Sequence, residues 1–306
     1  MTESTIQATS MSREPRPSVV LGLIKACRPK QWAKNVLVFV APAAAGHLNE
    51  LYTIRLTLMG FVAFCLVSSA TYLLNDILDV ESDRKHPTKH RRPIASGIVP
   101  IPLAIVTAAV LFAAGIGVAA WNNWQLAGIV AGYAAMTTAY SFWLKTIPVV
   151  DLVVLSAGFI LRLLGGAYAA HVGVSDWFLI ISCFGSLFIA AAKRYAEKKE
   201  LGDRAAELRP TLGEYSVEFL GLVRGVAAAS VLMSYCMWAV ERVREPGASS
   251  PWIQLSIIPF IIAILRYALL VDQGKGSAPE EVLMSDRQMQ LMGLLLVLFL
   301  FVGIYG

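Results

Sequence analysis

The chain has 306 residues, of which 57% are hydrophobic and 15% are charged, and its mean hydropathy is +0.62. Because a soluble domain carries about 25% charged residues, this composition excludes an ordinary soluble fold. The formal net charge is +5, and the basic residues gather in short polar segments between long apolar runs. This pattern indicates an all-α protein embedded in a membrane, and we expect no nucleic-acid partner.

The N-terminal segment, residues 1–18, is polar, contains prolines and lacks the apolar core of a signal peptide. We expect it to form a disordered tail on the cytosolic side. The remainder, residues 19–306, is expected to form a single transmembrane domain.

Nine apolar segments are predicted to cross the membrane, since one crossing takes about 20 residues. They are residues 35–47, 55–80, 100–120, 125–143, 148–169, 177–195, 216–240, 252–271 and 288–305. The first is short for a span unless residues 18–34 continue the same helix. The predicted fold is therefore a polytopic bundle of about nine helices.

A basic segment precedes the first span, where residues 28–35 read Arg-Pro-Lys-Gln-Trp-Ala-Lys-Asn. Such a run is often an anchor at the membrane surface. The same groups can bind the phosphate of a lipid, so Arg28, Lys30 and Lys34 are candidate phosphate ligands. The two interpretations are compatible.

The sharpest functional signal is the acidic run from Asn75 to Asp83, at the end of the second span. Residues 56–74 before it contain no charged side chain, and ionisable groups at membrane depth rarely lie there without a function. On a helix, Asn75, Asp79 and Asp83 recur every four residues and share one face. Three oxygen ligands on one face favour a hard divalent cation, and Mg²⁺ that carries a phosphorylated substrate is the expected ion. The alternative is a solvated acidic helix end that pairs with the basic residues after it.

Two polar groups mark the fourth and fifth spans. Residues 140–145 read Tyr-Ser-Phe-Trp-Leu-Lys, and they form either an interfacial anchor with a snorkelling lysine or part of a polar site. In the fifth span, Asp151 and Arg162 are eleven residues apart, close to three helical turns, and share a face with Gly158. Arg162 lies deep in the span and needs either an ionic partner in the protein or a phosphate.

The end of the sixth span is strongly basic and reads Lys-Arg-Tyr-Ala-Glu-Lys-Lys-Glu at residues 193–200. One interpretation is the excess of positive charge that cytosolic loops carry. The other is a binding face, because Glu197 lies three residues after Arg194 and four after Lys193. A cationic face opposite a metal-bearing carboxylate face would clamp a substrate with several phosphates.

The distribution of Lys and Arg predicts the orientation in the membrane. Residues 84–92 hold five Lys or Arg and residues 25–34 hold four, without an acid in either segment, whereas residues 121–124 and 171–176 hold none. The positive-inside rule therefore places the N-terminus and the acidic run in the cytosol. With nine spans, the C-terminus of this cell-membrane protein lies outside.

Together, these features resemble the UbiA superfamily of intramembrane prenyltransferases. The resemblance covers the motif Asn75-Asp76-x-x-Asp79-x-x-x-Asp83, the basic loop after it, the run Tyr140-Ser141-x-x-Leu144-Lys145 and the nine spans. It implies a helical bundle around a cavity that opens to the cytosol. In that family, the asparagine and the aspartates at positions 79 and 83 would hold Mg²⁺ on a diphosphate, while Tyr140, Ser141 and Lys145 would line the same cavity.

One departure from the superfamily pattern indicates a branch. Typical members carry a second aspartate-rich motif after the sixth span, where this chain has the cations of residues 193–198. Together with residues 28–35, this resembles the decaprenyl-phosphate phosphoribosyltransferase branch. The resemblance implies transfer of 5-phosphoribose from phosphoribosyl pyrophosphate to a polyprenyl phosphate, with release of pyrophosphate, for the arabinan precursor of an actinobacterial-type cell wall.

The resemblance also assigns roles to residues. The catalytic, metal-holding residues would be Asn75, Asp79 and Asp83. The candidate substrate-binding residues are Arg28, Lys30, Lys34, Asn35, Asp76, Tyr140, Ser141, Lys145, Arg162, Lys193, Arg194, Tyr195, Glu197 and Lys198.

Two other functions compete with this one. The first is an ordinary prenyltransferase that moves a prenyl group from a prenyl diphosphate to an aromatic acceptor. The second is a transporter for an anionic lipid or metabolite, although transporters commonly show paired repeats with broken spans, which this sequence lacks. A homo-oligomer is one option for the assembly.

Overall fold

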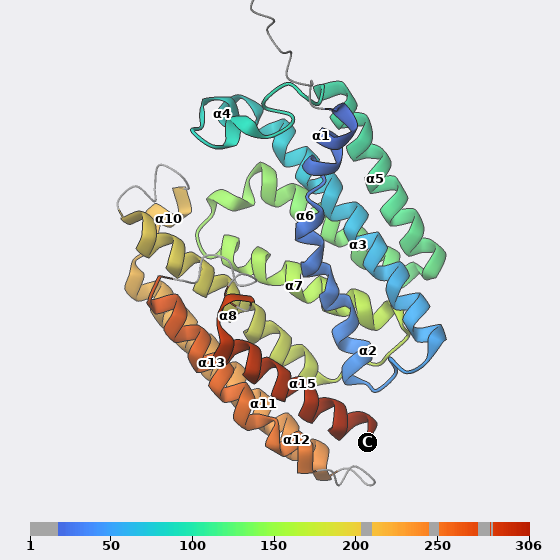
Figure 1. Cartoon of the computed structure of the whole chain (residues 1–306), viewed down its shortest axis with the longest axis vertical. Helices are drawn as coiled ribbons and strands as arrows, with labels where there is room; N and C mark the ends of the chain where they lie inside the picture. Colours follow the sequence, from blue (N-terminus) through green and yellow to red (C-terminus); the bar gives the residue numbers. More distant parts are fainter. Residues whose placement is uncertain (1–17, 203–209, 245–250, 275–281, 283) are drawn as a thin grey trace, which may run out of the picture.

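The computed structural model describes residues 18–202, 210–244, 251–274, 282 and 284–306 (Figure 1), and every regular element in these residues is a helix. The predicted tail, except for Ser18, lies outside the described residues. The long helices are α3 (Leu51–Leu78), α5 (Ile101–Asn122), α6 (Trp124–Phe142), α7 (Val150–Ala169), α8 (Asp176–Leu201), α11 (Val217–Arg244), α13 (Ile257–Asp272) and α15 (Arg287–Tyr305). The short α-helices are α1 (Val19–Ala26), α2 (Val40–Ala44), α4 (Val80–Lys85), α10 (Pro210–Glu214) and α12 (Pro251–Leu255). The 3-10 helices are η1 (Pro29–Phe39), η2 (Lys89–Arg91) and η3 (Leu144–Thr146).

Within the described residues, seven helical segments are long and apolar enough to cross a membrane. They are α3, α5, α7, α8, α11, α12 with α13, and α15. This confirms an all-α, polytopic membrane protein, but it does not confirm the predicted count of nine. Helix α6 has 19 residues but is less apolar, because it carries polar side chains such as Thr137 and Tyr140. The predicted span 35–47 is formed by η1 and α2, which are not one continuous α-helix.

The η1 segment packs one face against α3 and α7. Figure 1 shows α1, η1 and α2 following one another alongside α3. Backbone that is not α-helical is tolerated at membrane depth only where protein surrounds it, and Asn35 and Val38 of η1 are fully buried. The close approach to α7 requires glycine, since a Cβ atom on Gly166 would collide with the Val38 carbonyl group.

The apolar core is divided among three clusters of buried side chains. One cluster joins η1, α3, α6 and α7 around Phe64 and Tyr133, whose rings meet edge to face with centroids 5.4 Å apart. A second joins α8, α11 and α13 around Phe188 and Tyr267. The third joins α1, α3 and α5 near Leu73. The bundle is therefore packed on both sides of α7, which contacts helices from both halves of the chain.

The acidic run lies across a break between two helices. Helix α3 ends at Leu78, Asp79 has φ −91° and ψ 4°, and α4 begins at Val80. Backbone hydrogen bonds still run from the Asp79 N–H to the Asn75 carbonyl (2.9 Å) and from the Asp83 N–H to the Asp79 carbonyl (2.8 Å). The expectation of one uninterrupted helical face is therefore wrong at Asp79. We call the end of the bundle that carries this motif the α4 end, and the opposite end, which carries α12 and the C-terminus, the α12 end (Figure 1).

Candidate active site

A cavity of about 1290 Å³ lies between the two halves of the bundle. Its wall follows α8 from Asp176 to Lys193, which corresponds to about 25 Å along the helix axis at 1.5 Å per residue. Most of the lining is apolar, and polar side chains lie at both ends. Those toward the α4 end are Lys34, Tyr72, Tyr140 and Lys193, and those toward the α12 end are His47, Asp176, Glu241 and Arg242. The cavity thus extends over most of the roughly 30 Å of a bilayer's hydrocarbon core.

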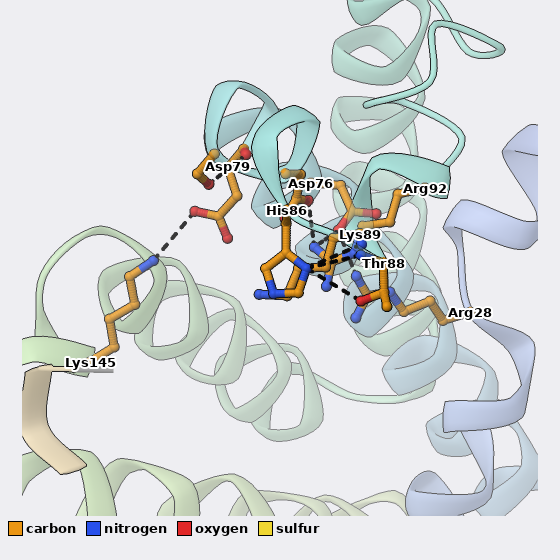
Figure 2. A network of polar contacts seen from close by, with 10 residues as sticks. Arg28, Asp76, Asp79, His86, Thr88, Lys89, Arg92 and Lys145 are labelled. Atoms are coloured by element: carbon orange, nitrogen blue, oxygen red, sulfur yellow. Dashed lines mark hydrogen bonds and ion pairs between the residues drawn. The ribbon is translucent and has the colours of Figure 1, made fainter. Parts of the chain in front are cut away.

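The acidic motif begins where this cavity reaches the α4 end. Tyr72 lines the cavity, and Asn75 and Asp79 follow it at the spacing of one helical face. Both are only partly buried. The Lys145 ammonium lies 3.6 Å from the Asp79 carboxylate (Figure 2), and these side chains are 38% and 40% exposed. The accessible Asp79 carboxylate therefore lies beside a cation at the α4 end, about two helical turns along the chain from the cavity-lining Tyr72.

The other two aspartates of the motif are held by arginines. Arg28 Nη2 donates to Asp76 Oδ1 at 2.5 Å, and Arg92 Nη1 donates to the same oxygen at 3.1 Å and to Asp83 Oδ2 at 2.6 Å. Asp76 and Asp83 are both buried. Figure 2 shows Arg28 and Arg92 on the side of Asp76 that lies away from Lys145. The motif is neither a solvated helix end nor a row of three equivalent ligands.

This arrangement limits how a metal could bind. The described residues contain no group of three or more His, Cys, Asp or Glu side chains that could hold a metal ion. Asn75 and Asp79 still offer partly exposed hard oxygen donors at the α4 end, and Asp83 has its Oδ1 beside the oxygen that Arg92 engages. Mg²⁺ is commonly bound by only one or two carboxylates, with phosphate oxygens and water completing the shell. The donor set fits such an ion and does not fit a cage made of protein ligands alone.

The run at residues 140–145 separates into three environments. The Tyr140 ring lines the cavity, and its hydroxyl accepts a 3.1 Å hydrogen bond from Arg194 Nη2. Lys145 faces Asp79, as described above. Ser141 is buried, and its hydroxyl donates to the Thr137 carbonyl within α6 at 2.8 Å. This corrects the expectation that Ser141 lines the cavity, because its hydroxyl is used inside its own helix.

Arg194 is buried inside a polar network and is not a free phosphate ligand. Its guanidinium donates to Asp151 Oδ2 at 2.8 Å and to Glu197 Oε2 at 2.7 Å. The Tyr215 hydroxyl donates to Asp151 Oδ1 at 2.6 Å and accepts from the Val149 N–H. Burial and the neighbouring carboxylate raise the pKa of Tyr215 well above its usual range. The predicted role of Arg194 as a substrate ligand is therefore corrected to that of a tie between helices.

Arg162 and Asn35 form a second buried tie. Arg162 donates to Asn35 Oδ1 at 2.7 Å, to the Gly158 carbonyl at 2.6 Å and to the Tyr133 hydroxyl at 2.6 Å. The Asn35 amide in turn donates to Ser68 Oγ at 3.3 Å. Arg162 also borders the cavity. The ion pair with Asp151, which the shared helical face allowed, does not form, since Asp151 binds Arg194 across the helix interface.

The remaining candidates fall on both sides of the cavity wall. Lys34 and Lys193 line the cavity, and the Lys193 ammonium lies 4.0 Å from Glu197 Oε1. The Tyr195 hydroxyl donates to Asp272 Oδ1 at 2.7 Å, on the side of α8 that packs on α13. This corrects the expectation that Tyr195 orients the substrate. Lys30 is exposed and Lys198 is partly buried, and neither borders the cavity.

Four polar residues of the site were not among the predicted ones: Tyr72, Arg92, Tyr133 and Tyr215. Tyr72 could have been found from its helical spacing to Asn75 and Asp79. The partners of Arg92 and Tyr215 come from other elements, so no local pattern identifies them.

The sequence profile of the UbiA prenyltransferase family matches residues 36–304. The chain belongs to this family. It is 43% identical over 297 residues to a decaprenyl-phosphate phosphoribosyltransferase of Corynebacterium glutamicum, which covers 96% of this chain and 90% of the relative. It is 44% identical over 285 residues to the Mycobacterium tuberculosis protein of the same name. This alignment covers 92% of this chain and 93% of the relative. These similarities confirm the resemblance to the UbiA family that the motifs indicated.

The fold is also that of solved UbiA proteins. A UbiA homologue from Archaeoglobus fulgidus, bound to DMAPP and Mg²⁺, superposes with a TM-score of 0.67 at 17% identity, over 92% of this chain and 99% of the homologue. The apo structure of a UbiA homologue from Aeropyrum pernix superposes with a TM-score of 0.62 at 14% identity, over 90% and 98%. At these identities the likeness shows the UbiA fold alone.

Proposed function

We propose that this UbiA-family protein transfers 5-phosphoribose from phosphoribosyl pyrophosphate to decaprenyl phosphate or a similar polyprenyl phosphate, and releases pyrophosphate. The observation that carries the proposal is the identity of more than 40% to decaprenyl-phosphate phosphoribosyltransferases over nearly the whole length. The geometry supports it, because Lys34 and Lys193 line the cavity toward the α4 end, and the acidic motif follows the cavity-lining Tyr72 on α3. A donor and an acceptor that both carry phosphate groups suit a site with these cations.

The donor diphosphate would lie at the mouth of the cavity. Asn75 and Asp79, together with Oδ1 of Asp83, would hold Mg²⁺ there, and the bound ion would neutralise charge on the departing pyrophosphate. Lys145, next to Asp79, would bind the same diphosphate through its ammonium group. Asp76 would act indirectly, because it orients Arg28 and Arg92.

The acceptor lipid would lie along the cavity. Its apolar wall beside α8 suits a polyprenyl chain, and Lys34 or Lys193 would bind the lipid phosphate or the ribose 5-phosphate. A phosphate monoester is already anionic at neutral pH, so its oxygen can attack the ribose C1 without a strong general base. Attack from the face opposite the pyrophosphate would invert the configuration at C1.

The orientation follows from charge. The α4 end carries the basic segments 25–34 and 84–92, so this end would face the cytosol of a cell membrane. Phosphoribosyl pyrophosphate is water-soluble and would reach the acidic motif from that side. The C-terminus lies at the α12 end (Figure 1) and would face outward.

The test is a transfer assay with the purified full chain, Mg²⁺, polyprenyl phosphate and phosphoribosyl pyrophosphate labelled in the ribose. We expect label in the lipid, and we expect removal of divalent ions or the Asp79→Asn variant to abolish it. The matched control is Glu81→Gln, a carboxylate two residues away that pairs only with Arg84 in the described structure and should retain transfer. Consumption of a labelled prenyl diphosphate without ribose transfer would favour the prenyltransferase. Lipid movement without pyrophosphate release would favour a transporter.

A further inference from the structure

A second, smaller pocket of about 280 Å³ lies on the other side of the acidic motif. Its polar lining comes from the end of α1, the residue directly before η1, the end of α3 and the segment after α4 that contains η2. The lining residues that matter here are Lys25, Arg28, Asp76, Thr88, Arg91 and Arg92. It shares no lining residue with the large cavity, so a ligand here would occupy a separate site.

The pocket carries an excess of positive charge. Four of its side chains are basic, and Asp76 is the one carboxylate in the lining. Arg28 and Arg92 contact that carboxylate, whereas Lys25 and Arg91 have no ion pair within the described residues. Cations that converge in a concave site raise the local concentration of anions. An anion in this pocket would balance the positive charge that Asp76 and Asp83, the carboxylate partners of Arg28 and Arg92, leave uncompensated.

Two of the four cations, Arg28 and Arg92, are held in place before any ligand arrives. Arg28 has a left-handed backbone conformation (φ 53°, ψ 60°), and its guanidinium is fixed by Asp76 and by the face of the Tyr72 ring at 4.8 Å. Arg92 is fixed by its two aspartates. In the loop, the His86 ring nitrogen accepts from the Thr88 N–H at 3.2 Å, which sets the turn that brings the Thr88 side chain to the pocket (Figure 2). Pre-ordered donors lose less entropy on binding than mobile ones.

We propose that this pocket is a binding site for a phosphate group. Guanidinium forks match phosphate oxygens in geometry as well as in charge, and the pocket offers three of them with an ammonium and a hydroxyl. The phosphate could belong to a soluble anion or to a lipid headgroup. The lipid source is supported by α1, where Val20, Leu21 and Ile24 are exposed apolar residues beside Lys25, as expected of a helix at the membrane surface.

The experiment measures binding to the purified full chain without divalent metal and without phosphoribosyl pyrophosphate, so that the acidic motif cannot recruit a diphosphate through a metal. One arm titrates inorganic pyrophosphate by calorimetry. The other measures retention of labelled phosphatidic acid from phosphatidylcholine vesicles that hold the protein. Binding of pyrophosphate alone identifies a soluble source, and binding of phosphatidic acid alone identifies a lipid source.

The decisive variant is Lys25→Ala with Arg91→Ala, which removes the two cations without an ion pair. The matched control, Lys85→Ala with Lys89→Ala, removes the same charge from exposed positions outside the pocket. We expect binding to weaken about tenfold or more in the first variant, as the loss of charge-assisted hydrogen bonds predicts, and to stay unchanged in the control. Where thermal unfolding shows that the double variant is misfolded, Lys25→Gln alone carries the test.

Three results would overturn the proposal. They are no binding to the wild type, an equal loss in both double variants, and a loss on Lys193→Ala that matches the loss in the pocket variant. The last would place the anion in the large cavity. Because the assay contains no ribose donor, its failure and a failure of ribose transfer are separate results.

Discussion

Arg194 Nε lies 2.8 Å from Asp151 Oδ2, and the two side chains are 1% and 0% exposed. This pair joins α8 to α7 in the middle of the polar network that borders the cavity. Glu197 and the Tyr140 hydroxyl also bind the guanidinium. The pair therefore holds the cavity-lining Tyr140 in position, while Arg194 itself is not part of the cavity lining.

The first prediction concerns this pair. Asp151→Asn leaves the Arg194 guanidinium buried with one carboxylate fewer, and breaking a buried ion pair costs about 3–5 kcal/mol. We expect a clearly lower thermal unfolding midpoint in detergent. Lys193→Ala, one residue away, should unfold like the wild type, because an exposed ion pair contributes less than about 1 kcal/mol. An Asp151→Asn protein that unfolds normally but is inactive would instead place the pair in the chemistry.

The second prediction is a pH dependence. The pKa of Tyr215 is raised in the folded protein by burial and by its hydrogen bond to Asp151, so the folded state holds the phenol proton more tightly than the unfolded state. The stabilisation is fully present below the unfolded pKa of about 10, and it is lost as the pH rises through the folded value. We expect wild-type stability to fall above about pH 10 more steeply than that of Tyr215→Phe. Parallel curves in a denaturation series from pH 8 upward would contradict this.

The third prediction concerns the packing of η1. Gly166→Ala would drive a methyl group into the Val38 carbonyl, and backbone cannot move aside as a side chain can. Overpacking costs about 1–3 kcal/mol even where side chains adjust, so we expect a lower unfolding midpoint and lower activity, because Asn35 and Lys34 lie on the displaced segment. Gly132→Ala in α6 is the control, since its Cβ meets nothing within 4 Å. Equal stability of the two variants would show that η1 can shift.

Much of the fold follows from hydropathy, because a bilayer demands long apolar helices whatever their tertiary neighbours are. The 3-10 conformation of η1 could not be predicted in this way, since it depends on its packing against α3 and α7. The low hydropathy of α6 can be read from its sequence, but only the structure shows that its polar residues Tyr133, Thr137 and Tyr140 line a cavity.

In the candidate site, too, local sequence patterns predict part of the arrangement, and tertiary packing decides the rest. Helical spacing put Asn75, Asp79 and Asp83 on one face, but it assumed that the helix continues through Asp79. It also could not show that Arg92 engages one oxygen of Asp83. Spacing also allowed Asp151 to face Arg162 on its own helix. A periodic pattern gives the face of a helix and not the identity of the helix that packs on it, so the partner Arg194 could not be found.

The last prediction separates binding from folding at Lys145. Its ammonium lies 3.6 Å from the Asp79 carboxylate, and both groups are partly exposed, so the pair contributes less than about 1 kcal/mol to stability. Lys145→Met should therefore unfold at nearly the wild-type temperature. If Lys145 binds the donor diphosphate, the KM for phosphoribosyl pyrophosphate should rise about tenfold, as the loss of one charge-assisted hydrogen bond predicts. Initial rates at fixed lipid, compared with exposed Lys30→Met, give the measurement. A normal KM together with a lowered unfolding midpoint would mean that Lys145 supports the α3–α4 break and does not touch the donor.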